Sequence, residues 1–194
     1  MSHGERLPYK NMMAFAEGVL LFLAPFCERI ELAGSLRRKC STVGDIEIIA
    51  VPKTQATLFP GDTIVNTNIQ TMVDHALREK GCAILKDGPR YKQFIAYEQR
   101  VDLFLQPDPA TWGMNMVIRT GAANFSRWMV TGEELGGALP SGWYVRNGRV
   151  FNELSETVET PEEKDVFNRI GLQYIPLEER NERKWYKYKS YNRK

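Results

Sequence analysis

Two short stretches of the chain carry residues that could bind a phosphate chain and a divalent metal ion. Residues 34–38 combine a Gly-Ser turn with two arginines. Glycine lets the backbone approach a ligand, serine offers a hydroxyl and an N–H, and a guanidinium matches a pair of phosphate oxygens. Residues 44–47 place Asp45 and Glu47 on either side of one apolar residue. Together the two stretches predict an enzyme that transfers a nucleotide.

The two acids need a strand to bring them onto one face. Residues 45–51 are rich in isoleucine and valine, which are typical of strands. Because side chains two apart on a strand share a face, Asp45 and Glu47 should point the same way. Two metal ions need a third carboxylate, and Asp102 supplies one within the apolar strand pattern of residues 100–105.

Each of these motifs also occurs without any catalytic function. A Gly-Ser pair is usually a plain turn, and an acid-x-acid pattern is usually a solvated strand face. Asp102 could be an edge-strand acid with Arg100, two residues earlier on the same face, as its surface partner. An acid inside so apolar a run must still be satisfied by some partner. The ordered combination therefore favours a catalytic cluster.

The full set of motifs, in chain order, resembles DNA polymerase family X, the polymerase β-like branch of the nucleotidyltransferases. The matching motifs are Arg6-Leu7-Pro8, Gly34-Ser35-x-Arg37-Arg38, Gly44-Asp45-Ile46-Glu47, Arg100-Val101-Asp102, Thr120-Gly121 followed by Phe125, residues 163–167, and Tyr174-Ile175-Pro176 followed by Arg180. They cover nearly the whole chain.

The resemblance implies an α+β fold. We expect a nucleotidyltransferase palm over residues 1–108, with a mixed or antiparallel sheet backed by helices. A small α+β nucleotide-binding subdomain, comparable to a thumb, should follow over residues 109–194 and end in a basic, aromatic tail over residues 183–194. The chain begins at the catalytic subdomain, without a helix-hairpin-helix or lyase-like domain, so we expect weak and distributive DNA binding.

The resemblance also implies roles for individual residues. Asp45, Glu47 and Asp102 would be catalytic acids that hold two Mg²⁺ ions, with Mn²⁺ able to substitute, and Arg100 would orient Asp102 or touch the primer terminus. The expected nucleotide-binding residues are Gly34, Ser35, Arg38, Gly44, Arg119, Thr120, Gly121, Asn124 and Ser126. Arg6 is a candidate phosphate contact, and the candidate nucleic-acid contacts are Arg127, Arg183, Lys184, Lys187 and Lys189. Arg37 is expected in a salt bridge between the subdomains.

Two positions differ from the pattern of the family. Glu47 stands where the family usually has aspartate, so the added methylene could change metal spacing or metal preference. Ile118 and Arg119 stand where aromatic residues often pack beneath the incoming sugar. Sugar discrimination is therefore left open by the sequence.

The predicted function is a DNA-directed DNA polymerase that adds deoxynucleoside triphosphates to primer-template or gapped DNA, filling short gaps in repair. One alternative is a template-independent nucleotidyltransferase acting on RNA, protein or a small molecule. Another is an inactive relative that only binds nucleic acid. Retention of three carboxylates and both arginines argues against decay of the site.

Composition agrees with a globular protein, with 194 residues, 43% hydrophobic residues and a net charge of +2. Residues 180–194 hold seven basic residues and one acidic residue, so this segment either binds nucleic acid or packs back on the second subdomain. Three cysteines without metal-ligand spacing, and two histidines, argue against a zinc site. No secretion signal or membrane span is apparent, and we expect a monomer in the cytoplasm, or a viral protein acting in the host cytoplasm.

Periodicity predicts the remaining elements. We expect helices at 13–26, 66–80 and 121–135, strands at 29–33, 82–86, 91–97, 100–106 and 113–119, a loop at 53–65 and a subdomain boundary at 107–109. Asn147-Gly148 predicts a type I′ hairpin. Thr160 is the expected N-cap of a last helix, with Pro161 at its first position. Trp112, Trp128 and Trp143 are expected in packing rather than in base stacking.

Overall fold

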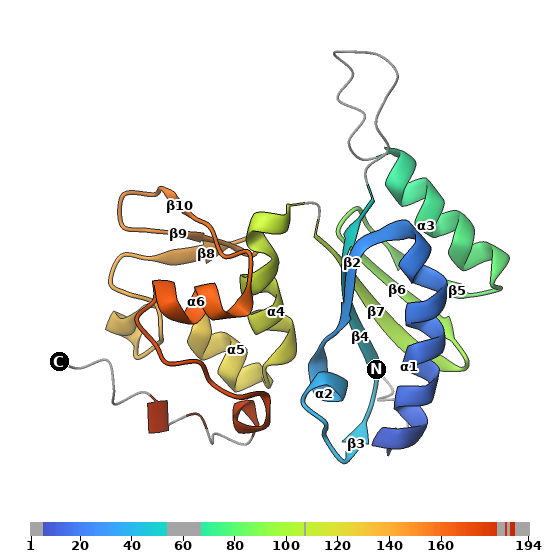
Figure 1. The fold of residues 1–194 in the computed structure, drawn as a ribbon, viewed down its shortest axis with the longest axis horizontal. Helices are drawn as coiled ribbons and strands as arrows, with labels where there is room; N and C mark the ends of the chain where they lie inside the picture. Colours follow the sequence, from blue (N-terminus) through green and yellow to red (C-terminus); the bar gives the residue numbers. More distant parts are fainter. Residues whose placement is uncertain (1–5, 54–66, 107, 182–184, 186, 189–194) are drawn as a thin grey trace, which may run out of the picture. The chain divides into compact units, whose positions relative to one another are not determined.

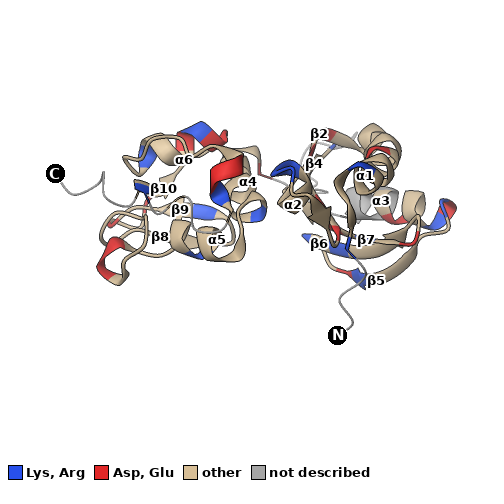
Figure 2. Cartoon of the chain, turned by 90° about the horizontal axis from the view of Figure 1, so that it is seen from below, with Lys and Arg blue, Asp and Glu red and all other residues tan. Residues whose placement is uncertain are grey.

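The computed structural model describes residues 6–53, 67–106, 108–181, 185 and 187–188, with side chains in the helix at 67–79 described from residue 73 onward (Figure 1). Lys and Arg are interspersed with Asp and Glu over the described helices and strands (Figure 2). No helix among the described residues is both long and apolar enough to cross a membrane.

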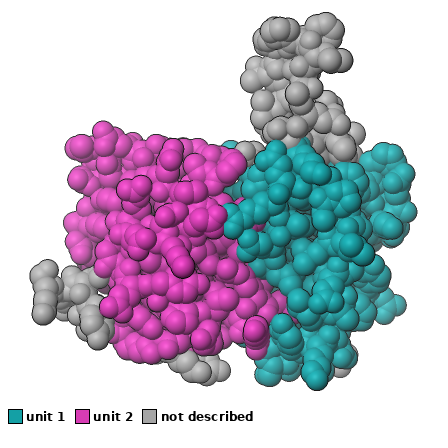
Figure 3. Space-filling model, in the orientation of Figure 1, with its two compact units in different colours: residues 1–32, 40–107 teal, residues 33–39, 108–194 magenta. Residues whose placement is uncertain are grey.

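The chain divides into two compact units (Figure 3). The first comprises Met1–Leu32 and Cys40–Pro107, and the second comprises Ala33–Lys39 and Asp108–Lys194. The short segment with the Gly-Ser turn thus groups with the second unit, although its neighbours in sequence belong to the first. Both units combine helices and strands, which confirms the predicted α+β class.

The first unit is built on a five-stranded sheet in the order β2-β4-β7-β6-β5. Its strands are β2 (Cys27–Leu32), β4 (Ile46–Pro52), β5 (Ala83–Asp87), β6 (Tyr91–Ala96) and β7 (Gln99–Leu105). Only the β4–β7 pair within this sheet is parallel, so the sheet is mixed, as expected. A two-residue strand, β1 (Leu7–Pro8), pairs with β3 (Thr42–Val43).

Two helices cover the apolar side of this sheet. They are α1 (Tyr9–Leu23), followed by the single turn η1 (Ala24–Phe26), and α3 (Thr67–Glu79) (Figure 1). Met12, Ala16, Val19 and Leu23 are fully buried and recur at helical spacing, so one stripe of α1 enters the core. The sequence correctly predicted a helix packed against the sheet, although α1 begins and ends a few residues earlier than expected.

The second unit surrounds its own aromatic core. Its elements are α2 (Gly34–Arg37), η2 (Pro109–Thr111), α4 (Trp112–Thr120), α5 (Ala123–Met129), η3 (Glu133–Leu135), β8 (Tyr144–Arg146), β9 (Arg149–Phe151), β10 (Thr157–Val158), α6 (Glu163–Arg169) and η4 (Leu177–Arg180). The strands β8 and β9 meet at Asn147 and Gly148, both with positive φ, which confirms the predicted hairpin.

The expected strand at 113–119 is wrong, because these residues lie in α4. Asp108 begins the preceding turn by accepting a hydrogen bond from the Ala110 N–H at 3.0 Å. Nearly every residue of α4 is buried, so its apolar run has no polar face from which a helical period could be recognised. Gly113 permits close packing, since an added Cβ would lie 2.1 Å from the Glu162 carbonyl oxygen.

Two other helix boundaries differ from the prediction. The helix expected at 121–135 is shorter and ends at Met129, and Gly136 then adopts a left-handed φ of 78°. The last helix, α6, begins at Glu163 rather than at Pro161, because Glu162 and Asp165 form a reciprocal capping box.

Candidate active site

The predicted acids lie on neighbouring strands of the first unit. In the parallel pair β4–β7, Ile46 is opposite Val101 and Glu47 is opposite Asp102. Ile46 and Val101 are fully buried, so Glu47 and Asp102 project from the other face. Asp45 precedes Glu47 by two residues and therefore belongs to the same face. This register brings the three predicted carboxylates to one end of the two strands.

Arg100 is bonded to Asp45 rather than directly to Asp102. Its Nη2 donates to Asp45 Oδ2 at 2.5 Å, whereas its Nε lies 3.9 Å from Asp102 Oδ2. The hydrogen bond to Asp45 is the main cause of the raised pKa of Arg100, and the charge of Asp102 adds to it. Arg100 thus places a positive charge among the acids.

Asp102 is also held by two side chains of β6 that the sequence analysis did not identify. The Tyr91 hydroxyl and the Gln93 amide each donate to Asp102 Oδ1 at 2.7 Å. Gln93 is the register partner of Asp102 in the β6–β7 pair. In the sequence Tyr91 and Gln93 are separated only by the charged Lys92, so no alternation marks them, and only the register shows which acid they serve.

The three carboxylates fit Mg²⁺ in donor chemistry, since that ion prefers oxygen ligands. The Arg100 guanidinium occupies the position at Asp45 that a metal ion would take. As the side chains lie, no group of three metal-ligating residues has converged anywhere in the described part of the chain. Metal binding at this face would therefore require Asp45 to exchange Arg100 for the ion.

Arg6 lies beside the glycine that precedes the acids. Its Nη2 donates to the Thr42 carbonyl at 2.6 Å and its Nε to the Thr42 hydroxyl at 3.2 Å. An added Cβ on Gly44 would lie 3.4 Å from Arg6 Nη1. The structure thus brings two predicted phosphate-binding residues together within the first unit, and the guanidinium is exposed.

In the second unit, both arginines of the Gly-Ser segment bind the Thr120-Gly121 turn. Arg37 donates to the Thr120 hydroxyl at 3.0 Å, and Arg38 Nη1 donates to the Thr120 carbonyl at 2.5 Å. Arg38 Nε also donates to Asn181 at 2.7 Å. Thr120 is fully buried, so the bonds that its hydroxyl and carbonyl accept from the two arginines fix the turn in the interior of the unit.

Arg37 continues into a buried ion network. Its Nη2 donates to Glu163 Oε2 at 2.7 Å, and Arg180 Nη1 donates to Glu163 Oε1 at 2.8 Å. Burial favours a higher pKa for Glu163, but the Arg37 hydrogen bond and the charges of Arg180 and Arg37 outweigh it and lower the pKa. Arg180 is fully buried, with its guanidinium 5.4 Å from the ring centroids of three aromatic residues, Phe125, Phe167 and Tyr174. Arg37 groups with the second unit, so this pair lies within that unit.

Gly34 and Ser35 lie in the first turn of α2, and the remaining predicted nucleotide-binding residues, with the predicted nucleic-acid contact Arg127, fall into two groups. Gly121 and Ser126 have structural contacts, because a Cβ on Gly121 would lie 2.3 Å from the Phe125 ring and Ser126 donates to the Ile118 carbonyl at 2.6 Å. Asn124, Arg127 and Arg119 are exposed. Asn124 and Arg127 are three residues apart on α5, so they present one polar face.

The described part of the tail packs back on the second unit. Trp185 is 1% exposed, and its ring stacks on Trp128 with centroids 4.6 Å apart. Lys187 pairs with Glu179 at 2.7 Å and is largely exposed. Arg183, Lys184 and Lys189 lie outside the described residues.

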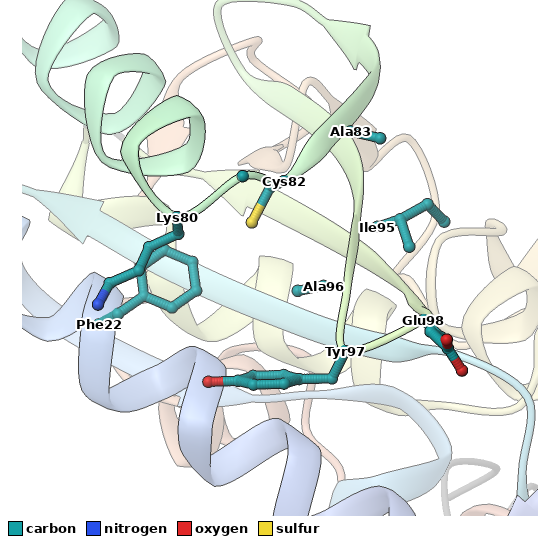
Figure 4. A pocket seen from close by; sticks show the side chains of 9 residues that line it. Phe22, Lys80, Cys82, Ala83, Ile95, Ala96, Tyr97 and Glu98 are labelled. Atoms are coloured by element: carbon teal, nitrogen blue, oxygen red, sulfur yellow. The ribbon is translucent and has the colours of Figure 1, made fainter.

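A cavity of about 340 Å³ lies elsewhere in the first unit (Figure 4). It is lined by residues of α1, of the α3–β5 connection and of the β6–β7 turn, among them Phe22, Cys82 and Tyr97. Burial raises the pKa of the Cys82 thiol, which disfavours the reactive thiolate. None of the predicted catalytic acids lines this cavity.

No protein-family model matches the chain, and no curated protein matches it. The function of the protein is therefore inferred from its own residues and their arrangement.

Proposed function

We propose that the protein is a nucleotidyltransferase of the DNA polymerase family X type, which adds deoxynucleotides to a primer 3′-hydroxyl in short gaps of DNA. The observation that carries the proposal is the parallel register that sets Glu47 beside Asp102, with Asp45 on the same face. A solvated pair of acids on one strand needs no acid beside it on the next strand, whereas a cluster of three carboxylates offers the oxygen ligands that two-metal phosphoryl transfer uses.

The first unit would supply the acidic residues. Asp45, Glu47 and Asp102 would hold Mg²⁺, which activates the primer hydroxyl and neutralises the leaving pyrophosphate. Arg100 would leave Asp45 and then orient the acids or the primer terminus. Arg6 and Gly44 would contact phosphate.

The second unit would supply nucleotide contacts. Arg38 has two nitrogens bonded to Thr120 and Asn181, which fixes the plane of its guanidinium, and its Nη2 would contact phosphate. Asn124 and Arg127 are exposed on one face of α5 and would contact the incoming base or the nucleic acid. The basic and aromatic tail does not support the proposal of DNA binding, because its Trp185 is buried in the core and cannot stack on a base.

The acceptor distinguishes this function from its alternative. Transfer of a labelled nucleotide should be compared among gapped DNA, single-stranded DNA and RNA, with Mg²⁺ present and each of the four bases in the template. We expect templated incorporation on gapped DNA. Untemplated addition to single-stranded DNA or RNA would instead assign the protein to the template-independent nucleotidyltransferases.

A further inference from the structure

Asp102 receives two hydrogen bonds on one oxygen from side chains that the expected two-metal chemistry does not itself require. We propose that Tyr91 and Gln93 are positioning residues for Asp102, and that they make the acidic face selective for Mg²⁺ over larger divalent ions. The inference rests on the proposed function, because it assigns Asp102 to a metal ion.

Both donors reach the same carboxylate oxygen. Tyr91 and Gln93 each lie 2.7 Å from Asp102 Oδ1, and the Gln93 amide nitrogen is 3.0 Å from the Tyr91 hydroxyl oxygen. Rotation of the carboxylate would break both bonds at once. Oδ2 is therefore the oxygen that Asp102 can offer to a ligand, and it lies 3.9 Å from Arg100 Nε.

The two donors are themselves fixed. Gln93 faces Asp102 across the β6–β7 ladder, and Tyr91 faces Phe104 in the same ladder. The rings of Tyr91 and Phe104 stack with centroids 5.1 Å apart, and Lys86 Nζ lies 5.6 Å from the Tyr91 centroid. Regular strand backbone and a stacked ring thus hold the hydroxyl at Asp102, which is the arrangement expected of residues that orient a metal ligand.

The metal preference follows from the number of oxygens available. Mg²⁺ requires near-octahedral ligands at short distance, whereas Ca²⁺ accepts more ligands and both oxygens of one carboxylate. A carboxylate with Oδ1 engaged by two donors offers a single oxygen, which suits Mg²⁺. Removing the donors frees the second oxygen and the rotation of the group, which suits Ca²⁺.

The test uses the full chain and two matched pairs of variants. Tyr91→Phe keeps the stacked ring and removes the hydroxyl, and Gln93→Met keeps the length and removes the amide. Tyr97→Phe and Gln99→Met make the same changes in the first unit outside this network. Binding of Mn²⁺ is followed by the electron spin resonance of the free ion, with Mg²⁺ or Ca²⁺ as competitor.

Removing a side chain that hydrogen-bonds to a metal ligand usually alters metal affinity or activity by about 10- to 100-fold. We expect Tyr91→Phe and Gln93→Met to raise the affinity for Ca²⁺ relative to the affinity for Mg²⁺ by about 10-fold or more, as measured by competition of each ion with Mn²⁺. In primer extension with Mg²⁺, kcat should fall by a similar factor while KM for the deoxynucleotide stays near the wild-type value. The two control variants should match wild type in both measurements.

The outcomes separate the inference from the proposed function. A wild-type competition ratio in Tyr91→Phe and Gln93→Met overturns the inference, even where the wild-type protein extends primers. A shifted ratio in a protein that extends no primer upholds the positioning role and overturns the polymerase. Mn²⁺ binding that is unchanged in Asp102→Asn overturns both.

Discussion

Glu47 and Asp102 face each other as register partners across the only parallel strand pair of the five-stranded sheet. Parallel pairing aligns the starts of both strands, so acids near the two starts meet on one face. Asp45 and Arg100 occupy the next positions outward and form an ion pair. Register, rather than proximity in sequence, assembles the candidate catalytic cluster.

The first prediction concerns Glu47. Replacing it with glutamine removes a charge expected to stabilise bound metal, an effect of several kcal/mol that corresponds to about 10³-fold in kcat. Glu47→Asp keeps the charge and should retain activity within about 10-fold, with an altered Mg²⁺ requirement. Single-turnover extension at varied Mg²⁺ measures both variants. Equal activity of Glu47→Gln and wild type would exclude Glu47 as a metal ligand.

The second prediction concerns the buried network at Glu163. Glu163→Gln leaves Arg37 and Arg180 without their shared carboxylate, and breaking a buried ion pair in this way costs about 3–5 kcal/mol. The folded-state pKa of Glu163 lies below its unfolded value, so its contribution is complete above the unfolded pKa and is lost as pH falls through the folded pKa.

The free energy of unfolding by urea, measured from neutral to acidic pH, checks this second prediction. The difference between wild type and Glu163→Gln should be largest at neutral pH and should shrink in acid, as the wild-type carboxylate gains a proton. Glu159→Gln, at an exposed acid of the same unit, should change neither the free energy of unfolding at neutral pH nor its dependence on pH. A pH-independent difference would show that the charge of Glu163 is not what stabilises the unit.

The third prediction concerns the tail. Trp185→Ala removes a buried ring stacked on Trp128, and a large-to-small change of this kind costs about 3–5 kcal/mol. Lys187→Ala removes an exposed ion pair to Glu179 and should leave the melting temperature close to the wild-type value. Thermal unfolding distinguishes them. Comparable melting temperatures for Trp185→Ala and wild type would mean that the tail does not pack in solution as it does in the structure.

The fourth prediction concerns Lys92, which is fully buried on β6 and forms ion pairs with Asp74 of α3, at 2.6 Å, and with Asp87 of β5. Lys92→Met removes the buried cation that Asp74 and Asp87 share, so we expect a loss of about 3–5 kcal/mol of unfolding free energy. Adding Asp74→Asn should restore part of it. Chemical denaturation of the single and double variants measures the recovery, and an unchanged loss in the double variant would contradict the pairing with Asp74.

Much of the first unit follows from the sequence. The strands around Asp45 and Asp102 are predictable because each is a short apolar run, rich in β-branched or bulky side chains, with its acid near the start. Their parallel pairing is not, since no local pattern determines which strands become neighbours. The same limit explains why Tyr91 and Gln93 escaped notice, because a polar residue in a strand does not identify its cross-strand partner.

The second unit was harder to predict for a different reason. Residues 113–119 are apolar nearly throughout, and a helix buried on all sides loses the period that distinguishes it from a strand. The bond between Arg37 and Glu163 joins positions 126 residues apart. Such a contact follows from tertiary packing and has no local signal. The hairpin at Asn147-Gly148 was predictable, because its two residues adopt the left-handed conformation with little strain.

Extension of a labelled primer across a one-nucleotide gap tests the central claim most directly. Wild type, Asp102→Asn and a control, Glu98→Gln at an exposed acid of the β6–β7 turn, are compared with Mg²⁺ and with Mn²⁺. The account predicts templated addition by wild type and Glu98→Gln, and a rate lower by about 10³-fold or more in Asp102→Asn. Failure of wild type to extend the primer with either ion, or undiminished extension by Asp102→Asn, would contradict it.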